Sequence, residues 1–402
     1  MKSECVVTVR RGRERPVRAG HPWIFSGAVK SIDGYSAPGD LCTVRDEKGR
    51  FLARGYANAS SRITVRVLTL EDEPLDAAHI RQSIEKALSL RESLFGSNAI
   101  RGKKSALRAV NAEGDFLPGL IVDRYGEGLV VQALTAGMQR LKGLVVDSLR
   151  ALLSPLFIYE KIDAQMAAAE GVGADKTGVA GACLHGTLVS PLEIEENGAR
   201  FSVDIEGGQK TGFYLDQRRN RGIVRELSAG LELLNCFGYT GAFGVQAVLG
   251  GAALARSVDI SEKATAQAAL NASLNGIDPG RFPLEREDVF DFLRRDERLY
   301  GLVVLDPPKF AASKGELPGA LRGYKDINLH ALKRVRAGGF LMTFSCSGLV
   351  NEDLFQKVVF GAVTDSGRSV QIVRRLHADA DHPVNIAHRE GEYLKGLLLR
   401  VV

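Results

Sequence analysis

The stretch "LELLNCFGYTGAFGVQAVL", residues 231–249, decides the fold class of the C-terminal half of this chain. An apolar run of strand length, Leu231–Asn235, leads into a turn that contains two glycines. A helix follows up to Leu249, and Gly250 and Gly251 end it. A short apolar run before a glycine turn and a helix predicts one strand–turn–helix unit.

The same alternation continues toward the C-terminus. Strands are predicted at 257–260, 302–306 and 339–344, and the alanine-rich stretch 262–275 is the clearest of the helices between them. Nearly continuous Val and Leu runs between helices are typical of a parallel sheet that helices cover on both faces. Ligands bind such sheets outside the carboxyl ends of the strands. The residues predicted at those ends are Asn235, Asp259, Asp288, Asp306 and Cys346.

The turn after residue 235 favours a nucleoside cofactor that lacks a pyrophosphate. A dinucleotide fingerprint needs G-x-G-x-x-G, and this turn has only the pair Gly238 and Gly241. Asp259 follows where a carboxylate can accept hydrogen bonds from ribose hydroxyls, and Asp288 is placed to meet an adenine amino group. S-adenosylmethionine fits, because its cationic sulfonium tolerates an acidic pocket. Each carboxylate could instead cap the helix after it. The predicted cofactor-binding residues are Asn235, Phe237, Gly238, Tyr239, Thr240, Gly241, Asp259, Ile260, Asp288 and Val289.

The stretch "LDPPKF" (305–310) gives the predicted site a second feature. Two prolines fix the backbone in a rigid extended turn as the chain leaves the sheet. A flat base could lie against Pro307 and Pro308 while Asp306 hydrogen-bonds its edge, and Lys309 adds a positive charge. The alternative is a plain turn that ends the strand.

Cys346, in "FSCSG" (344–348), is the predicted nucleophile. A cytosine ring reacts poorly at its carbon 5 until a nucleophile adds at carbon 6. A thiolate can form that adduct, and the thiol leaves again after methyl transfer and proton loss. Asp306 would assist through a hydrogen bond to the ring. The alternative, an inert buried cysteine, is the interpretation for the other four cysteines, namely Cys5, Cys42, Cys183 and Cys236.

The N-terminal segment carries the excess positive charge of the chain. Residues 1–70 contain thirteen Lys and Arg against six Asp and Glu, whereas the whole chain has a net charge of +5. This asymmetry suggests a polyanion, and nucleic acid is the commonest. Arg10 and Arg11 could neutralise phosphates, and Trp23 or Phe25 could stack on an unpaired base. The alternatives are a basic but merely solvated β domain, and a core position for both aromatic rings.

Three domains are predicted: a β-rich module over 1–72, a mixed α+β domain over 73–188 and the parallel-sheet domain over 189–402. The middle domain combines helices over 77–94 and 138–153 with a hairpin around 120–131.

Five scattered cysteines indicate a reducing compartment and no zinc or other metal site. Arginines interrupt any signal peptide, and no apolar run is long enough for a membrane span. A cytoplasmic protein without membrane contact is expected.

Over nearly its full length the chain resembles the bacterial ribosomal RNA large-subunit cytosine-5 methyltransferases. The resemblance implies an N-terminal PUA domain and a C-terminal class I methyltransferase domain of Rossmann-like fold. It also implies S-adenosylmethionine as cofactor, ribosomal RNA or its assembly intermediate as partner, and Cys346 as nucleophile. It adds Asp216, Gln217 and Arg218 to the cofactor pocket and includes Asp306 there. The matching stretches are "GHPWIFSGAV" (20–29), "LPGLIVDRYG" (117–126), "KTGFYLDQRRNR" (210–221), "LNCFGYTGAFGV" (234–245), "VLDPPKF" (304–310), "GYKDIN" (323–328), "TFSCSGL" (343–349) and "DHPV" (381–384).

Other functions remain open at this point. One is methylation of a ring or exocyclic nitrogen of guanine or adenine, with the Asp-Pro-Pro turn alone holding the base. Another is an RNA-binding assembly factor without catalytic activity. Related RNA cytosine-5 methyltransferases carry a second cysteine where this chain has Lys309, so a second thiol has no support. The target nucleotide stays undetermined, and a homodimer stays open.

Overall fold

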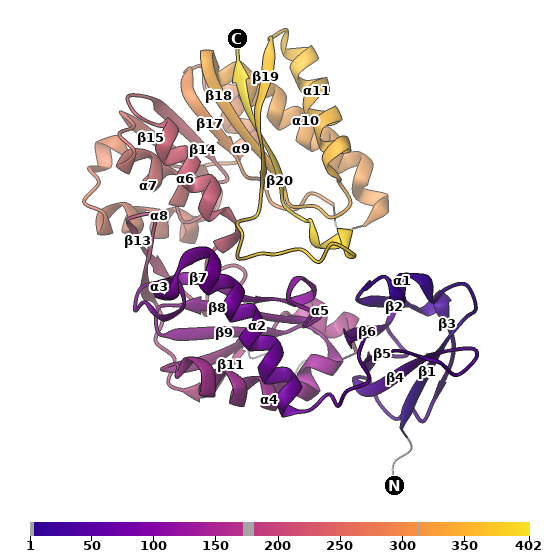
Figure 1. The fold of residues 1–402 in the computed structure, drawn as a ribbon. Coiled ribbons are helices and arrows are strands. Elements are labelled where there is room, and N and C mark those ends of the chain that lie inside the picture. Colours follow the sequence, from indigo (N-terminus) through magenta and orange to yellow (C-terminus); the bar gives the residue numbers. More distant parts are fainter. Residues whose placement is uncertain (1–3, 172–180, 312) are drawn as a thin grey trace. The chain divides into compact units, whose positions relative to one another are not determined.

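A computed structural model describes residues 4–171, 181–311 and 313–402 of the chain. The described residues form two units (Figure 1). The first unit comprises Met1–Ile194, Val203–Leu215 and Ala380–Gly391, and the second comprises Glu195–Ser202, Asp216–Asp379 and Glu392–Val402. Among the described residues, no helix is both long and apolar enough to cross a bilayer.

The N-terminal part of the first unit is a six-stranded sheet with the order β2-β6-β5-β4-β1-β3. Val7, Val9, Val44 and Val65 from three of its strands are buried together in an apolar core. This sheet confirms the β-rich module expected at the N-terminus. Its elements are β1 (Cys5–Val9), α1 (Arg15–Arg18), β2 (Trp23–Phe25), η1 (Ser26–Ala28), β3 (Val29–Asp33), β4 (Asp40–Asp46), β5 (Phe51–Ala57) and β6 (Ile63–Thr69).

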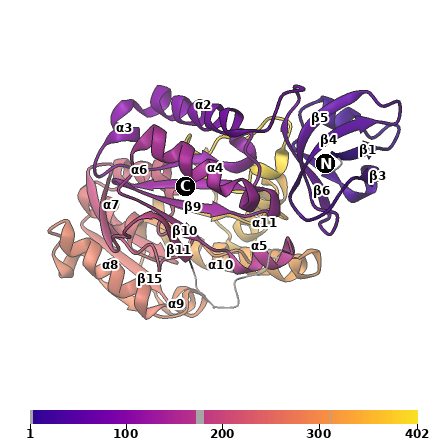
Figure 2. The ribbon, with the colours of Figure 1, turned by 90° about the horizontal axis from the view of Figure 1, so that it is seen from below.

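The rest of the first unit is built on a five-stranded sheet with the order β11-β10-β9-β8-β7. The predicted hairpin is β8 and β9, which pair antiparallel, and the predicted helices are α2 and α4, which pack against each other (Figure 2). Its elements are α2 (Ala77–Phe95), α3 (Ser97–Arg101), β7 (Ala106–Asn111), η2 (Ala112–Asp115), β8 (Leu120–Tyr125), β9 (Gly128–Ala133), α4 (Ala136–Leu153), β10 (Phe157–Lys161), α5 (Ala164–Ala169) and β11 (Gly181–Gly186). A two-stranded sheet of β12 (Leu192–Glu196) and β13 (Ala199–Val203) follows.

The second unit contains a seven-stranded sheet with the order β16-β15-β14-β17-β18-β20-β19. The first five strands in this order are parallel, as predicted. The last two differ, because β20 runs antiparallel to both β18 and β19. No helical crossover lies between β19 and β20, so the chain can return in the opposite direction. The strands are β14 (Glu232–Cys236), β15 (Leu254–Asp259), β16 (Leu284–Arg286), β17 (Tyr300–Leu305), β18 (Val335–Ser345), β19 (Val370–His377) and β20 (Lys395–Val401).

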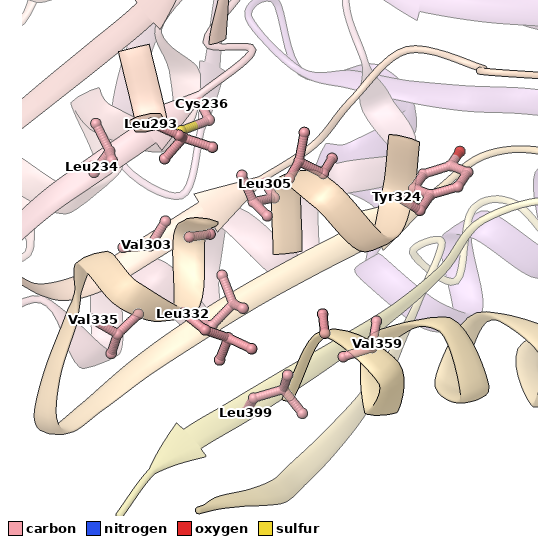
Figure 3. Close-up of a cluster of buried hydrophobic side chains, with 14 of the residues drawn as sticks. Leu234, Cys236, Leu293, Val303, Leu305, Tyr324, Leu332, Val335, Val359 and Leu399 are labelled. Carbon is pink, nitrogen blue, oxygen red and sulfur yellow. The ribbon is translucent and has the colours of Figure 1, made fainter. Parts of the chain in front are cut away.

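Helices connect most of these strands and pack against the sheet, whose central strand β17 is buried along its whole length. Figure 3 shows Leu234, Val303 and Leu399 from three strands packed with Leu332 of α10 and Val359 of α11. The helices and 3₁₀ turns of this unit are η3 (Leu215–Gln217), α6 (Arg218–Leu227), α7 (Ala242–Leu249), α8 (Glu262–Leu274), η4 (Pro279–Arg281), α9 (Val289–Arg295), η5 (Lys314–Glu316), α10 (Leu317–Arg334) and α11 (Glu352–Ser366), and η6 (Arg389–Gly391) follows in the first unit.

The cysteines separate by environment. Cys5, Cys42 and Cys236 are buried, as expected for inert thiols. The same expectation is wrong for Cys183, which is exposed on β11, the edge strand of its sheet. Cys346 is partly exposed, one residue beyond the end of β18.

Candidate active site

The five parallel strands bring the predicted site residues together at the carboxyl ends of the strands. In register, Cys236 of β14 pairs with Leu305 of β17, and Leu305 pairs with Thr343 of β18. Asp306 and Cys346 therefore follow the carboxyl ends of two neighbouring parallel strands, β17 and β18. Asp259 is the last residue of β15, and Asp288 follows β16 by two positions. The strand ends have the geometry in which parallel α/β sheets bind ligands.

The turn after β14 has a strained, compact backbone. Phe237, Tyr239 and Gly241 have φ values of 56°, 45° and 75°, in the left-handed region. A side chain at Gly241 would place its Cβ 2.8 Å from the Cβ of Ala268, and one at Gly238 would lie 3.1 Å from Nδ2 of Asn235. The positive φ and the 2.8 Å contact favour glycine at Gly241, and the space at Gly238 is tight. Left-handed non-glycine residues such as Phe237 and Tyr239 cluster at ligand sites.

Asp259 connects this turn to the next strand. Its Oδ2 accepts a hydrogen bond from the backbone N–H of Tyr239 at 2.8 Å, and its Oδ1 accepts one from Ser261 at 2.9 Å. These bonds hold the half-buried carboxylate beside the turn. The neighbouring Ile260 is 66% exposed, which is unusual for isoleucine and leaves an apolar surface beside the carboxylate.

Two side-chain amides, those of Asn235 and Asn271, form hydrogen bonds beside this turn. Nδ2 of Asn235 donates to Oγ of Ser257 at 3.2 Å, and Nδ2 of Asn271 donates to the Thr240 carbonyl at 2.9 Å. Oδ1 of Asn235 is buried and has no hydrogen-bond partner among the described residues. A buried acceptor, a carboxylate and a close-packed glycine turn fit a ligand that brings hydroxyl donors and positive charge, as S-adenosylmethionine does.

Asp288 caps the helix that follows it. Its Oδ1 accepts from the backbone N–H groups of Phe290 at 2.8 Å and Asp291 at 3.3 Å. The capping alternative from the sequence is therefore present in the structure, and contact with adenine stays a prediction. Val289 is 2% exposed and packs in the core, so only its backbone could face a ligand.

The Asp-Pro-Pro turn presents a mixed surface. Asp306 is half-buried, Pro307 is buried, and Pro308 and Lys309 are exposed. Burial raises the pKa of the nearby Tyr324 phenol to about 12, and negative charge on Cys346 and Asp306 adds to the rise. The Tyr324 hydroxyl lies near the Cys346 loop, because Ser345, the residue before Cys346, donates a hydrogen bond to it.

Hydrogen bonds hold the loop around Cys346. Oγ of Ser345 donates to the Tyr324 hydroxyl at 3.0 Å, and Oγ of Ser347 donates to the Ala311 carbonyl at 3.3 Å. Both serines are fully buried, whereas Cys346 between them is partly exposed. The loop thus leaves Cys346 partly accessible to solvent while hydrogen bonds hold the two neighbouring serines.

Lys395, the first residue of β20, was not predicted from the sequence. It is 4% exposed, and its Nζ donates to the carbonyls of Ser347 at 2.7 Å and Val350 at 2.6 Å, both in the loop after Cys346. The sequence feature that could have indicated this residue is a lysine at the start of the apolar run "KGLLLRV" (395–401). The pairing of β20 with β18, which sets its position, was not readable from the sequence.

The segment 216–218 lies against the chain around β19 and β20. Oδ2 of Asp216 accepts from the Tyr393 hydroxyl at 2.6 Å, and its carbonyl accepts from the Asp379 N–H at 2.9 Å. Arg218 forms an ion pair with Asp379 at 3.7 Å. Asp216 and Gln217 are each 2% exposed, so this segment is a firmly packed part of the second unit.

Of the predicted RNA-binding residues, Arg10, Arg11 and Trp23 lie in the first unit, whereas the Asp-Pro-Pro turn belongs to the second. Arg10 and Arg11 are exposed. Nε1 of Trp23 donates to Glu113 at 2.8 Å, and its ring centroid lies 4.3 Å from that of His388. Phe25 is 46% exposed, so the expectation that both aromatic rings of β2 could be core is wrong. The intervening residue of this strand packs in the core instead, because alternate residues face opposite sides.

Comparison with known proteins defines the class. Residues 7–70 match a PUA-like domain family, and residues 174–400 match an S-adenosylmethionine-dependent methyltransferase family. The C-terminal α/β domain is therefore that of an S-adenosylmethionine-dependent methyltransferase, joined to an N-terminal PUA-like domain.

Full-length relatives narrow the class. "Ribosomal RNA large subunit methyltransferase I" of Shewanella denitrificans is 43% identical over 401 residues, which cover 98% of this chain and 99% of the relative. The protein of the same name from Aeromonas salmonicida is 43% identical over 396 residues, 97% of this chain and 98% of the relative. The chain belongs to the family of these methyltransferases. The crystal structure of SMU.776 complexed with SAH shares its fold, with a TM-score of 0.84 at 22% identity, and covers 98% of this chain and 100% of that one.

Proposed function

We propose that this methyltransferase forms 5-methylcytosine in large-subunit ribosomal RNA through a covalent adduct on Cys346. The observation that carries the proposal is the position of the thiol. Cys346 is partly exposed between two buried serines, at the same sheet edge as Asp306 and next to the strand that bears it. The names of the full-length relatives support ribosomal RNA as the substrate.

In the proposed reaction the Cys346 thiolate adds to carbon 6 of the cytosine and makes carbon 5 nucleophilic. Asp306 accepts a hydrogen bond from the exocyclic amino group or protonated ring nitrogen, and Pro308 offers the base a rigid flat surface. Bound S-adenosylmethionine supplies the methyl group for carbon 5. Transfer of the carbon 5 proton to a solvent water then lets the electron pair of that C–H bond restore the ring double bond, which breaks the bond to sulfur and releases the Cys346 thiolate. The cytosine must be unpaired or flipped out to reach the site.

The same proposal assigns the cofactor pocket. The turn of Gly238 and Gly241 would approach the cofactor closely with its backbone, Asp259 would accept from the ribose hydroxyls, and Asp288 would accept from adenine. The half-buried carboxylate of Asp259, held by two backbone N–H groups, supports this assignment. The remaining proposed contacts are Asp216, Gln217, Arg218, Asn235, Phe237, Tyr239, Thr240, Ile260, Val289 and Asp306.

RNA binding is assigned to the N-terminal module. The exposed Arg10 and Arg11 would pair with phosphates. Trp23 and Phe25 would offer ring surface to an unpaired base. We keep 1–72, 73–188 and 189–402 as the proposed domain boundaries, and we propose the cytoplasm as the place of action.

A thiol substitution tests the proposal. Cys346→Ala should lower methyl transfer to protein-free large-subunit ribosomal RNA at least about 1000-fold, because the nucleophile is lost. Labelled S-adenosylmethionine provides the measurement. Cys183→Ala is the matched control, since it removes an exposed thiol from the other unit and should leave the rate unchanged.

Two outcomes would overturn the covalent mechanism. One is full activity of Cys346→Ala. The other is failure of native protein to form a stable adduct with RNA that contains 5-fluorocytosine, which blocks proton loss at carbon 5. Mapping of the label to a guanine or adenine nitrogen would replace the mechanism by one in which the Asp-Pro-Pro turn alone holds the base.

A further inference from the structure

Lys395 is a buried positive charge at the base of the Cys346 loop. Its backbone pairs with Ser345 across the β18–β20 ladder, one residue before the thiol. Its Nζ donates to the carbonyls of Ser347 and Val350, at 2.7 and 2.6 Å, on the other side of the thiol. Lys395 is thus held beside Cys346 by its backbone on one flank and by its ammonium on the other.

The carbonyl ligands of Lys395 do not neutralise its charge. Among the described residues, no carboxylate forms an ion pair with Lys395 within 4.0 Å. Burying an ammonium is costly unless a nearby negative charge compensates it. A thiolate at Cys346 would be that charge.

The neighbouring elements contribute further charges. Burial lowers the pKa of Lys395. Nearby negative groups oppose this effect, and the contribution of Cys346 is the largest among them. Glu352 at the start of α11 and the exposed Glu392 before β20 act more weakly in the same direction. Tyr324 of α10 carries no charge at neutral pH, because its pKa is raised to about 12. The Asp306 carboxylate contributes to the rise in the pKa of Tyr324.

We propose that Lys395 is a positioning residue whose ammonium favours the thiolate form of Cys346, an inference that rests on the nucleophilic role proposed above. The hydrogen bonds to two carbonyls keep the ammonium protonated and aimed at the loop. An opposite charge within reach of a titrating group favours its charged form by about 1–3 pKa units. The alternative is a purely structural lysine that satisfies two buried carbonyls.

Alkylation of Cys346 by iodoacetamide separates the two roles without RNA or cofactor. The rate is followed by mass spectrometry from pH 5 to 10, and the exposed Cys183 in the same sample is the reference. In native protein the midpoint pH for Cys346 should lie below the ordinary thiol value of about 8.5. Lys395→Met should raise this midpoint by about 1–2 pH units and slow alkylation at pH 7 about tenfold or more. Lys395→Arg, which keeps the charge, should remain near native protein.

Tyr324→Phe is the matched control. It removes the hydrogen bond to Ser345 from the same loop without removing a charge, so the midpoint should stay in place. A midpoint unchanged in folded Lys395→Met, or shifted equally in Tyr324→Phe, would reduce Lys395 to a structural anchor. If Lys395→Met does not fold, a native midpoint at or above about 8.5 would overturn the proposal. Failure of the proposed function shows up separately, as retained activity of Cys346→Ala.

Discussion

Two cysteines at the ends of parallel strands have opposite chemistry in this protein. Cys236 is the last residue of β14, fully buried among apolar side chains, and burial raises the pKa of its thiol (Figure 3). Cys346 lies one residue beyond β18, partly exposed and close to the buried Lys395. A difference of one position relative to the strand end therefore separates a core thiol from a candidate nucleophile, because residues beyond the ladder need not follow its alternation.

The glycine turn is the residue-scale feature that we expect to be least tolerant. Gly241→Ala should weaken S-adenosylmethionine binding at least about tenfold and lower the free energy of unfolding by about 1–3 kcal/mol. The reasons are the φ of 75° and the contact of the new Cβ with Ala268 at 2.8 Å. Calorimetric titration and urea unfolding measure the two effects.

A second glycine supplies the control. Gly143 lies inside α4, with open space around the position of a Cβ, so Gly143→Ala should raise the free energy of unfolding by about 0.5–1 kcal/mol and leave cofactor affinity unchanged. Native-like affinity in Gly241→Ala would remove the turn from the proposed pocket.

At the scale of elements, the site is assembled where strands end and helices begin. The N-terminus of α8 is capped by Ser261 and that of α9 by Asp288, each directly after a strand end. The first turns of these helices need acceptors for their unpaired N–H groups. Polar residues at these positions therefore serve helix formation whether or not they also bind a ligand, which explains why the sequence alone left both interpretations open.

Two substitutions at Asp288 distinguish these roles. Asp288→Ala should lower the free energy of unfolding by about 1 kcal/mol, whereas Asp288→Ser should keep most of it, since serine is also a good N-cap. If Asp288 also accepts from adenine, both variants should lose S-adenosylmethionine affinity about tenfold, because neither retains the carboxylate. Urea unfolding and calorimetric titration provide the measurements, and native affinity in Asp288→Ser would leave Asp288 as a cap only.

At the scale of the whole molecule, the first unit is built from three separate segments of the chain. One of them, Ala380–Gly391, lies in sequence between the last two strands of the other unit's sheet. The buried ion pair of Arg91 and Asp115 holds this segment through Asp381. Arg91 of α2 donates to Asp115 at 2.7 Å and also to the Asp381 carbonyl at 2.7 Å, and the Arg108 N–H donates to the Asp381 carboxylate at 2.9 Å. Residues almost 300 positions apart thus share one buried polar network.

Removal of this arginine should be costly. Arg91→Met should lower the free energy of unfolding by about 3–5 kcal/mol, because Asp115 and the Asp381 carbonyl would stay buried without their donor. Urea unfolding followed by circular dichroism measures it. Arg81→Met on the same helix breaks an exposed pair with Glu85 and should cost less than about 1 kcal/mol. Equal losses in the two variants would contradict a special role for the buried pair.

Local sequence patterns predicted many of the strands and helices correctly. The apolar runs at 231–235 and 302–306 correspond to β14 and β17 within one or two residues, and the helix predicted over 77–94 is α2. The hairpin of β8 and β9 and the parallel direction of five strands of the large sheet were also predicted from the sequence, whereas the order of these strands was not. These features depend on the spacing of apolar residues and on glycine turns, which are properties of neighbouring residues.

Contacts between distant segments were decided by tertiary structure alone. The antiparallel insertion of β20, the exposure of Cys183, the bond from Trp23 to Glu113 and the approach of Lys395 to the Cys346 loop all depend on which surfaces pack together. Periodicity tells which face of an element is apolar, but strand register and the free-energy balance of packing choose its neighbour. The sequence by itself therefore determined the elements and the residues at their ends, and only packing determined which of those residues meet.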